Sequence, residues 1–312
     1  MQENIQLSQK IKDIVHNLYP KASQVSVAVI DLQSITPTIA GYNMDDFMYP
    51  ASIYKVSIAA EILRKNDVGK LKLSDTVDIS DINEVDKDLK LFPKNTSRDH
   101  RPLLKGGDRV SIDYLLDLML TRSDNTAANT LMDIAGREDI NNYIILPNGW
   151  KGSDITRKFL DRLKEEKKYQ KSAITVSTTK HLAELFYKIE RGVLINVDVS
   201  KRLQEYMLKW NRGGRTGLNI PEYISYYRKG GWLEINGYKH NFFKALWRLI
   251  TNKNVVIRYS NDVGVVTGKN SKYVIAVLSI MKSKFPWTKF PMKELARRIH
   301  SLMDAAVLTD LL

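Results

Sequence analysis

Segments with the composition of β-strands lie near both ends of this 312-residue chain, and a long helical stretch separates them. The N-terminal segment is VSVAVIDL at 25–32, which is followed by a predicted hairpin partner at 38–41. The C-terminal segments are ISYYRKGGWL, VVIRYSNDVGVV and KYVIAVLSI, which are rich in β-branched and aromatic residues. This order predicts one antiparallel sheet made by both chain ends, with helices packed on it and a helical lobe inserted between them.

Apolar residues at helical spacing predict the helices around this sheet. Those outside the middle of the chain are an N-terminal helix containing Ile11 and Val15 and a closing helix at about 291–302. The central helices are predicted at 52–65, 111–120, 126–136, 157–169, 178–190 and 200–210. We therefore expect an α+β fold with a sheet lobe at 1–48 and 213–312 and an all-α lobe at 49–212. The functional site is expected at their junction, because sites favour lobe boundaries.

The basic composition does not identify a ligand. The formal net charge is +13, which is compatible with attraction to nucleic acid, anionic lipid or an acidic polymer. The basic residues are spread along the chain, however, and dense runs such as 164–171 alternate with acidic or polar residues, as solvated helix faces do. No zinc-ligand spacing, glycine-rich phosphate loop or aromatic RNA-binding signature accompanies the charge. We expect no metal, no cofactor and no nucleic-acid partner.

Compartment is not readable from composition. No apolar stretch approaches the ~20 residues that a membrane-spanning helix requires, and the N-terminus lacks the apolar block of a secretory signal. Cysteine is absent, which excludes a disulfide framework and thiolate chemistry but fits either redox environment. The sequence predicts a chain without a transmembrane segment, and the prior removal of a signal is compatible with it.

Serine followed three residues later by lysine places both side chains on one face of a helix, where an amine can reach the hydroxyl. The chain has three such pairs, Ser52 and Lys55, Ser177 and Lys180, and Ser279 and Lys282. Only the first combines a predicted helix start with an aromatic-Pro-Ala lead-in, which would point the backbone N–H of Ser52 at a bound anion. We therefore single out the pair at residues 52 and 55.

Two further elements follow this pair. Ser123-Asp124-Asn125, the only such triplet in the chain, is predicted to occupy a turn between two helices, where residues of these types often cap the next helix. The triplet at 229–231, Lys-Gly-Gly, lies on a predicted strand, where glycines allow a ligand to lie close to the backbone. The same triplet recurs in a loop at 105–107, so neither element is specific by itself.

Taken in order, S-x-x-K, S-D-N and K-G-G resemble the signature of the class A β-lactamases and penicillin-binding proteins, in which the third element is K-T-G. The resemblance extends to YPASIYKV, SDNTAANTLMDIAG, ITRKFLDR, ITVSTTKHLAELF and IPEYISYYRKGG, and it covers most of the chain from about Val25 onward. It implies a β-lactamase/transpeptidase-like fold and serine acyl-transfer chemistry without a cofactor. It also implies action outside the cytoplasm, and we expect a monomer.

The resemblance assigns catalytic roles to three residues. Ser52 would be the acylated nucleophile, and Lys55 would be its general base or proton partner. Ser123 would relay a proton to the leaving nitrogen of a β-lactam or a related cell-wall amide. Each has a structural alternative, since a lysine can simply be solvated and a turn serine can simply cap a helix.

The resemblance also assigns binding roles. Asn125 would donate a hydrogen bond to, or accept one from, the side-chain amide of the substrate, and Lys229 would attract its carboxylate. The backbone N–H groups of Ser52 and Trp232 would form the oxyanion hole, with Gly231 allowing the close approach. Such a hole contributes ~3 kcal/mol or more per donor in serine hydrolases.

The expected deacylation glutamate is displaced in this chain. In the loop ITRKFLDRLKEEKKY, the position where class A enzymes carry the glutamate that activates water falls on Lys164. Glu165 and Glu166 follow one and two positions later and are the candidates for this role. Their alternative is a pair of solvated helix residues. A persistent acyl-enzyme would indicate a penicillin-binding protein or D-alanyl-D-alanine peptidase instead of a β-lactamase.

Two further departures concern substrate binding. Gly230 stands where the family has a threonine or serine whose hydroxyl helps to bind the carboxylate. A related arginine of the next strand would fall near Ser260, and Arg258, two residues earlier on the same strand face, is the candidate for that charge. The segment 233–254 is longer than the hairpin of the family.

A third interpretation concerns the whole chain. It would be a non-catalytic relative that binds cell-wall polymer through its basic surface.

Overall fold

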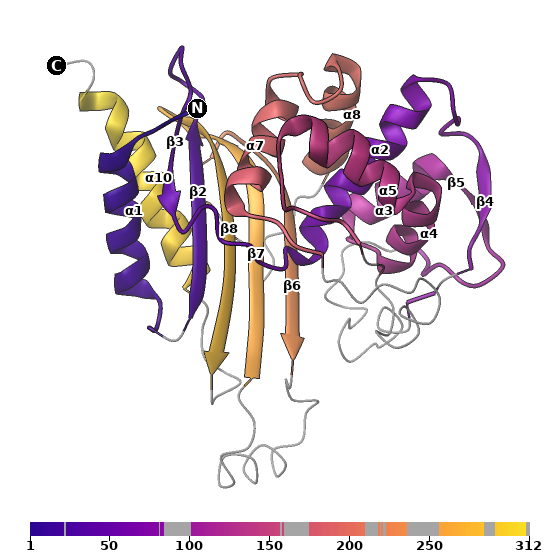
Figure 1. The fold of residues 1–312 in the computed structure, drawn as a ribbon, viewed down its shortest axis with the longest axis horizontal. Helices are drawn as coiled ribbons and strands as arrows, with labels where there is room; N and C mark the ends of the chain where they lie inside the picture. Colours follow the sequence, from indigo (N-terminus) through magenta and orange to yellow (C-terminus); the bar gives the residue numbers. More distant parts are fainter. Residues whose placement is uncertain are drawn as a thin grey trace, which may run out of the picture. The chain divides into compact units, whose positions relative to one another are not determined.

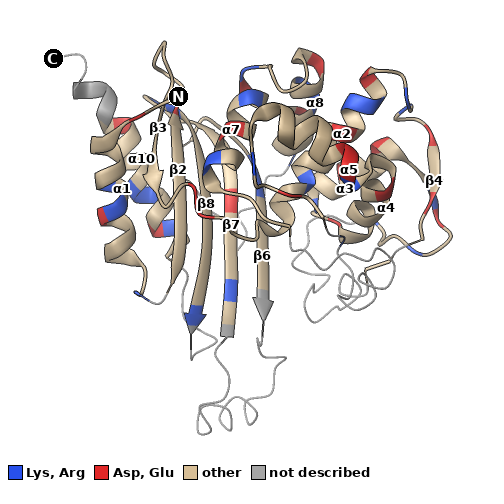
Figure 2. Cartoon of the chain, in the orientation of Figure 1, with Lys and Arg blue, Asp and Glu red and all other residues tan. Residues whose placement is uncertain are grey.

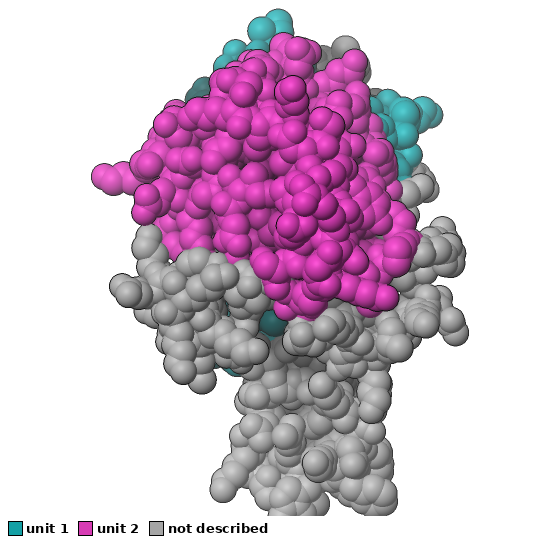
Figure 3. All heavy atoms as spheres, turned by 90° about the vertical axis from the view of Figure 1, so that its right-hand side faces the viewer, with its two compact units in different colours: residues 1–53, 178–187, 212–312 teal, residues 54–177, 188–211 magenta. Residues whose placement is uncertain are grey.

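The computed structural model describes residues 1–21, 23–80, 82–83, 101–156, 158, 175–209, 218, 220, 223–235, 256–283 and 291–309. Contacts divide the chain into two compact units, which Figure 3 colours separately. Unit 1 comprises 1–53, 178–187 and 212–312, and unit 2 comprises 54–177 and 188–211. The sequence placed the first boundary at 48/49 and assigned 178–187 to the inserted lobe, whereas this segment clusters with the sheet.

The sheet of unit 1 has the strand order β1-β3-β2-β8-β7-β6. Its strands are β1 (Gln2–Glu3), β2 (Gln24–Asp31), β3 (Thr38–Tyr42), β6 (Ser225–Ile235), β7 (Val256–Thr267) and β8 (Lys272–Ser283). The two-residue β1 pairs parallel with β3, and all the other pairs are antiparallel. The predicted sheet from both chain ends is therefore confirmed, with β2 beside β8 at its centre (Figure 1).

One face of the sheet packs against α1 (Ile5–Leu18) and α10 (Met292–Thr309). Ile11 and Val15, one turn apart on α1, are buried there with alternate residues of β2 and β8, such as Val27 and Val277. Asn4 caps α1 by accepting a hydrogen bond from the N–H of Leu7 at 3.0 Å. Strand alternation and helical spacing thus build the core that the sequence predicted.

The other face carries the first part of α7 (Thr179–Glu190). The ring of Phe186 stacks on that of Tyr227 of β6, with centroids 6.1 Å apart. The hydroxyl groups of Thr179 and Ser26 lie 2.6 Å apart in a buried hydrogen bond. These contacts explain why residues 178–187 cluster with the sheet.

Unit 2 is built around α2 (Lys55–Asp67), which packs against α3 (Ile112–Thr121), α4 (Asn125–Ala135) and α8 (Val197–Leu208). Shorter elements are α5 (Arg137–Ile140), a π-helical turn (Asn141–Ile145) and a 3-10 turn (Leu146–Asn148). A two-stranded sheet of β4 (Thr76–Asp78) and β5 (Arg109–Ser111) adds to the helices expected there. The apolar residues of α2, such as Val56, Ile58 and Ile62, are buried.

Two helix starts differ from the prediction for local reasons. A 3-10 turn, Ala51–Tyr54, precedes α2, so that Ser52 lies in this turn and α2 begins at Lys55. α8 begins at Val197, earlier than predicted, because Asn196 caps it by accepting from the N–H of Val199 at 2.9 Å. The helix predicted at 157–169 lies outside the described residues.

Charge and hydropathy single out no element of the structure. Lysine and arginine occur on helices of both units, with acidic residues among them (Figure 2). Within the described ranges, no helix is long and apolar enough to cross a membrane. The chemistry must therefore be located from individual side chains.

Candidate active site

The buried amine of Lys55 contacts two other residues of unit 2 that the sequence singled out. Its Nζ donates hydrogen bonds to the carbonyl oxygen of Ser123 and to Oδ1 of Asn125, both at 2.6 Å. The hydroxyl of Ser123 lies 3.2 Å from the same nitrogen. The structure therefore brings together three of the residues that the sequence singled out, in a geometry that allows a proton to pass between an amine and a hydroxyl.

Ser123 and Asp124 of the Ser-Asp-Asn triplet lie in the turn between α3 and α4, and Asn125 is the first residue of α4. Asp124 caps α4, because its Oδ1 accepts from the N–H of Ala127 at 2.8 Å. Ser123 has a φ of 60°, which is unusual for a residue with a side chain. The capping role that the sequence offered as an alternative thus falls on Asp124, while Ser123 and Asn125 contact Lys55.

Gly231 of β6 approaches the backbone of Ser52 within unit 1. A Cβ built on Gly231 would lie 2.7 Å from the nitrogen of Ser52 and 2.8 Å from the oxygen of Pro50. Both separations are below any ordinary contact, so only glycine fits here. The neighbouring Ala51 has a φ of 51°. The close approach places β6, which also bears Trp232, beside the backbone nitrogen of Ser52.

Asn261 is a site residue that the sequence analysis missed. It lies opposite Gly231 on β7 and donates from Nδ2 to the carbonyl oxygen of Tyr49 at 2.9 Å. Its Oδ1 accepts from the N–H of Ser279 on β8 at 3.0 Å. Asn261 thus ties the lead-in of Ser52 to the sheet. No signal in the sequence set Asn261 apart, because it stands between two other polar residues, Ser260 and Asp262.

Lys229 is fully buried on the face of β6 that also bears Tyr227 and Gly231. Its Nζ donates to the carbonyl oxygen of Gly230 at 3.1 Å. Trp232 points to the opposite face and is about half exposed, at 49%. β6 therefore holds the buried amine of Lys229 three residues before the backbone N–H of Trp232.

A family model described as the beta-lactamase enzyme family matches residues 6–302. The chain belongs to the beta-lactamase enzyme family. No curated protein sequence matches it.

Solved structures of this fold superpose along nearly the whole chain. A beta-lactamase from Sphaerobacter thermophilus is 20% identical, with a TM-score of 0.65 and coverage of 97% of this chain and 98% of that chain. A class A beta-lactamase from Bacteroides cellulosilyticus is 18% identical, with a TM-score of 0.68 and coverage of 98% and 99%. PBP-A is 19% identical, with a TM-score of 0.67 and coverage of 99% of both chains. The predicted β-lactamase/transpeptidase-like fold is therefore confirmed.

Gly230, the departure from the K-T-G motif of the beta-lactamase family, has a physical cause in this chain. Nη2 of Arg228, two residues earlier on the same strand face, would lie 2.8 Å from a Cβ built on Gly230. Arg228 cannot move aside freely, because it forms a buried ion pair with Asp262 of β7, in which Nε donates to Oδ1 at 3.0 Å. Asp262 also accepts from the N–H of Leu218 at 2.9 Å. The guanidinium therefore fills the space next to Gly230.

We expect Gly230→Ala to destabilise the protein by about 1–3 kcal/mol, because the added Cβ must displace Arg228 from its buried partner. The free energy of unfolding in urea measures this effect. Gly106→Ala, in the second Lys-Gly-Gly triplet, is the matched control, since among the described residues its Cβ would meet the end of the Ile82 side chain, at 3.2 Å. Equal stability of the two variants would contradict the explanation.

The register of the sheet places Arg258 on a different face from Lys229. Arg258 pairs with Glu234 and therefore lies on the Trp232 face of the sheet, opposite the face of Lys229. The deacylation candidates, Glu165 and Glu166, lie outside the described residues, as does most of the segment 233–254. Their roles remain predictions from the sequence.

Proposed function

We propose that this member of the beta-lactamase family is a serine acyl-transfer enzyme that is acylated at Ser52 by a β-lactam or a related cell-wall amide. The observation that supports it most is the contact of the buried Lys55 amine with Ser123 and Asn125. Ser52 precedes Lys55 by three residues in the chain, and we propose that the same amine serves the hydroxyl groups of both Ser52 and Ser123.

In the proposed first step, Oγ of Ser52 attacks the amide carbonyl carbon while its proton passes to a neutral Lys55 amine. The carbonyl oxygen becomes an anion and is bound by the N–H groups of Ser52 and Trp232. The C–N bond of the tetrahedral intermediate then breaks. The leaving nitrogen takes a proton from the hydroxyl of Ser123, which is reprotonated by Lys55, and Ser52 is left as an ester.

Binding of the substrate is assigned to polar groups around this ester. We propose that Lys229 attracts the substrate carboxylate and that Asn125 forms a hydrogen bond with its side-chain amide. Arg258 is the weaker candidate for carboxylate binding, because it lies on the other face of the sheet from Lys229. Gly231 has no side chain and therefore allows β6 to lie close to the backbone of Ser52.

Intact mass spectrometry after incubation with a fluorescent penicillin tests the proposal. We expect one covalent adduct on the wild-type chain, located at Ser52, and none on Ser52→Ala. Ser279→Ala is the control, because Ser279 belongs to another S-x-x-K pair but lies buried inside β8. An adduct that survives Ser52→Ala, or no reaction with any acyl substrate, would overturn the proposal and favour a relative that only binds.

The lifetime of the adduct separates the two enzymatic alternatives. Rapid loss with release of the hydrolysed product indicates a β-lactamase, in which Glu165 or Glu166 would activate the water. A persistent adduct indicates a penicillin-binding protein or peptidase. A mutant of PBP-A has been solved as an acyl-enzyme complex with penicillin G, at 20% identity to this chain. We further propose that the chain acts as a monomer outside the cytoplasm, where cell-wall peptides occur.

A further inference from the structure

A charged bridge spans Ser123 in unit 2. The residues on either side, Arg122 and Asp124, contact each other through Nη2 and Oδ2 at 2.8 Å and through Nε and Oδ2 at 3.1 Å. Both side chains are largely buried, with 10% and 3% exposed. The other carboxylate oxygen of Asp124 caps α4. The bridge therefore connects the residue before Ser123 to the first turn of the following helix.

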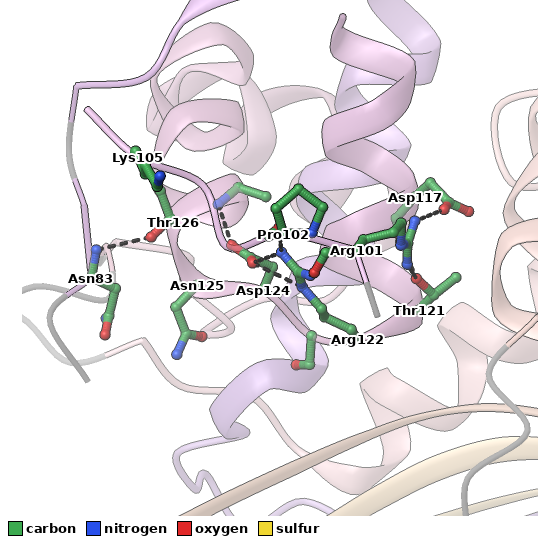
Figure 4. A network of polar contacts seen from close by, with 12 residues as sticks. Asn83, Arg101, Pro102, Lys105, Asp117, Thr121, Arg122, Asp124, Asn125 and Thr126 are labelled. Atoms are coloured by element: carbon green, nitrogen blue, oxygen red, sulfur yellow. Dashed lines mark hydrogen bonds and ion pairs between the residues drawn. The ribbon is translucent and has the colours of Figure 1, made fainter. Parts of the chain in front are cut away.

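The same guanidinium continues to a second segment of the chain (Figure 4). Nη1 of Arg122 donates to the carbonyl oxygen of Arg101 at 2.9 Å, and Nη2 donates to that of Pro102 at 3.1 Å. Three acceptor groups around one planar fork leave it little freedom to move. Arg101 in turn pairs with Asp117 and donates to Oγ1 of Thr121 at 2.7 Å, which fixes this segment to α3.

The bridge surrounds a strained residue. The φ of 60° at Ser123 is unfavourable for a residue with a Cβ and persists only where neighbouring contacts impose it. The carbonyl oxygen of Ser123 accepts from Lys55 Nζ at 2.6 Å in this conformation. If Ser123 returned to a negative φ, the peptide on one side of it would reorient. The carbonyl oxygen and Oγ of Ser123 would then move relative to the amine of Lys55.

We propose that Arg122 is a positioning residue that holds Ser123 in its left-handed conformation and thereby keeps its oxygens on Lys55. For its effect on rate the proposal rests on the proposed acylation of Ser52, whereas its effect on conformation does not. Arg122 itself is placed away from the reacting atoms, because its donors are directed to Asp124, Arg101 and Pro102.

The kinetic test compares Arg122→Ala with wild type in acylation by a fluorescent penicillin, resolved into the rate constant of acylation and the dissociation constant of the preceding complex. We expect the rate constant to fall by about 100-fold, as for a displaced catalytic group, with the dissociation constant changed less than threefold. Arg122→Lys should recover part of the rate only, because an ammonium group lacks the planar fork. A merely structural role would reduce the fraction of protein that reacts, not the rate constant.

Arg101→Ala is the matched control. It removes the contacts with Asp117 and Thr121 but leaves the bridge between Arg122 and Asp124 intact, so its rate constant should stay within about threefold of wild type, well short of the displaced-group effect. A crystal structure of Arg122→Ala gives a readout independent of activity. We expect φ of Ser123 to leave the left-handed region and its carbonyl oxygen to move away from Lys55.

Two outcomes overturn the proposal about Arg122. One is an acylation rate constant for Arg122→Ala within threefold of wild type, and the other is a crystal structure of the variant with the Ser123 turn unchanged. If wild type itself is not acylated by any acyl substrate, the proposed function fails instead, and the crystal structure alone then decides the role of Arg122.

Discussion

Replacing Gly231 by alanine is expected to slow acylation by at least ~100-fold, the loss typical of removing one oxyanion-hole donor. The new Cβ would lie 2.7 Å from the nitrogen of Ser52, 2.8 Å from the oxygen of Pro50 and 2.9 Å from the Cβ of Ala51. These neighbours are backbone or fixed atoms, so the strand and the turn must separate. Rapid-mixing fluorescence with a labelled penicillin measures the acylation rate.

Gly106→Ala serves as the control for this experiment as well, because the atom its Cβ would meet in the described part of the chain is a flexible methyl group of Ile82. The circular dichroism spectrum of Gly231→Ala should match that of wild type, since β6 is an edge strand and can shift without unfolding the sheet. Acylation by Gly231→Ala at the wild-type rate would mean that Ser52 does not use this part of β6.

Lys55→Ala should slow acylation by about 10²–10⁴-fold, the range for loss of a positioned acid–base group. The change also leaves the oxygens of Ser123 and Asn125 without their buried donor, at a cost of about 1–3 kcal/mol each in stability. Rate measurements at a temperature where the variant is folded separate the two effects. Thermal unfolding identifies that temperature.

Lys180→Ala is the matched control for Lys55→Ala. Lys180 belongs to a second S-x-x-K pair, yet its side chain is 39% exposed and faces Asp45 at 3.4 Å. Its removal should change neither the acylation rate nor the stability measurably, as is usual for an exposed pair. If both lysine variants were acylated equally fast, Lys55 would be a structural residue.

Most of the fold could be predicted from the sequence, because the residue patterns of strands and helices are local. The alternation in β2 and the spacing of Ile11 and Val15 in α1 each require only a few neighbouring residues to be read. The grouping of Lys55 with Ser123 and Asn125 was also predictable, but only through the order of motifs. Each motif by itself occurs elsewhere or caps helices in ordinary proteins.

The contacts that could not be predicted from the sequence depend on strand register and on residues far away in the chain. Asn261 gains its role from standing opposite Gly231, which a shift of one residue in β7 would abolish. Arg228 explains Gly230 only once Asp262 is known to face it. Likewise, the fork of Arg122 is completed by carbonyl groups about twenty residues earlier in the chain, which no local pattern reveals.

The strand order of unit 1 has a consequence for how the chain folds. β2 pairs along its whole length with β8, so that Val27 contacts a partner, Val277, that is synthesised near the end of the chain. Sheets with such distant pairing form slowly, because a long loop must close before any pair is gained. Most of unit 2, by contrast, is one continuous segment, 54–177. We therefore expect the approach of Gly231 to Ser52 to form late in folding, so that a nascent chain whose C-terminal strands have not yet joined the sheet lacks it.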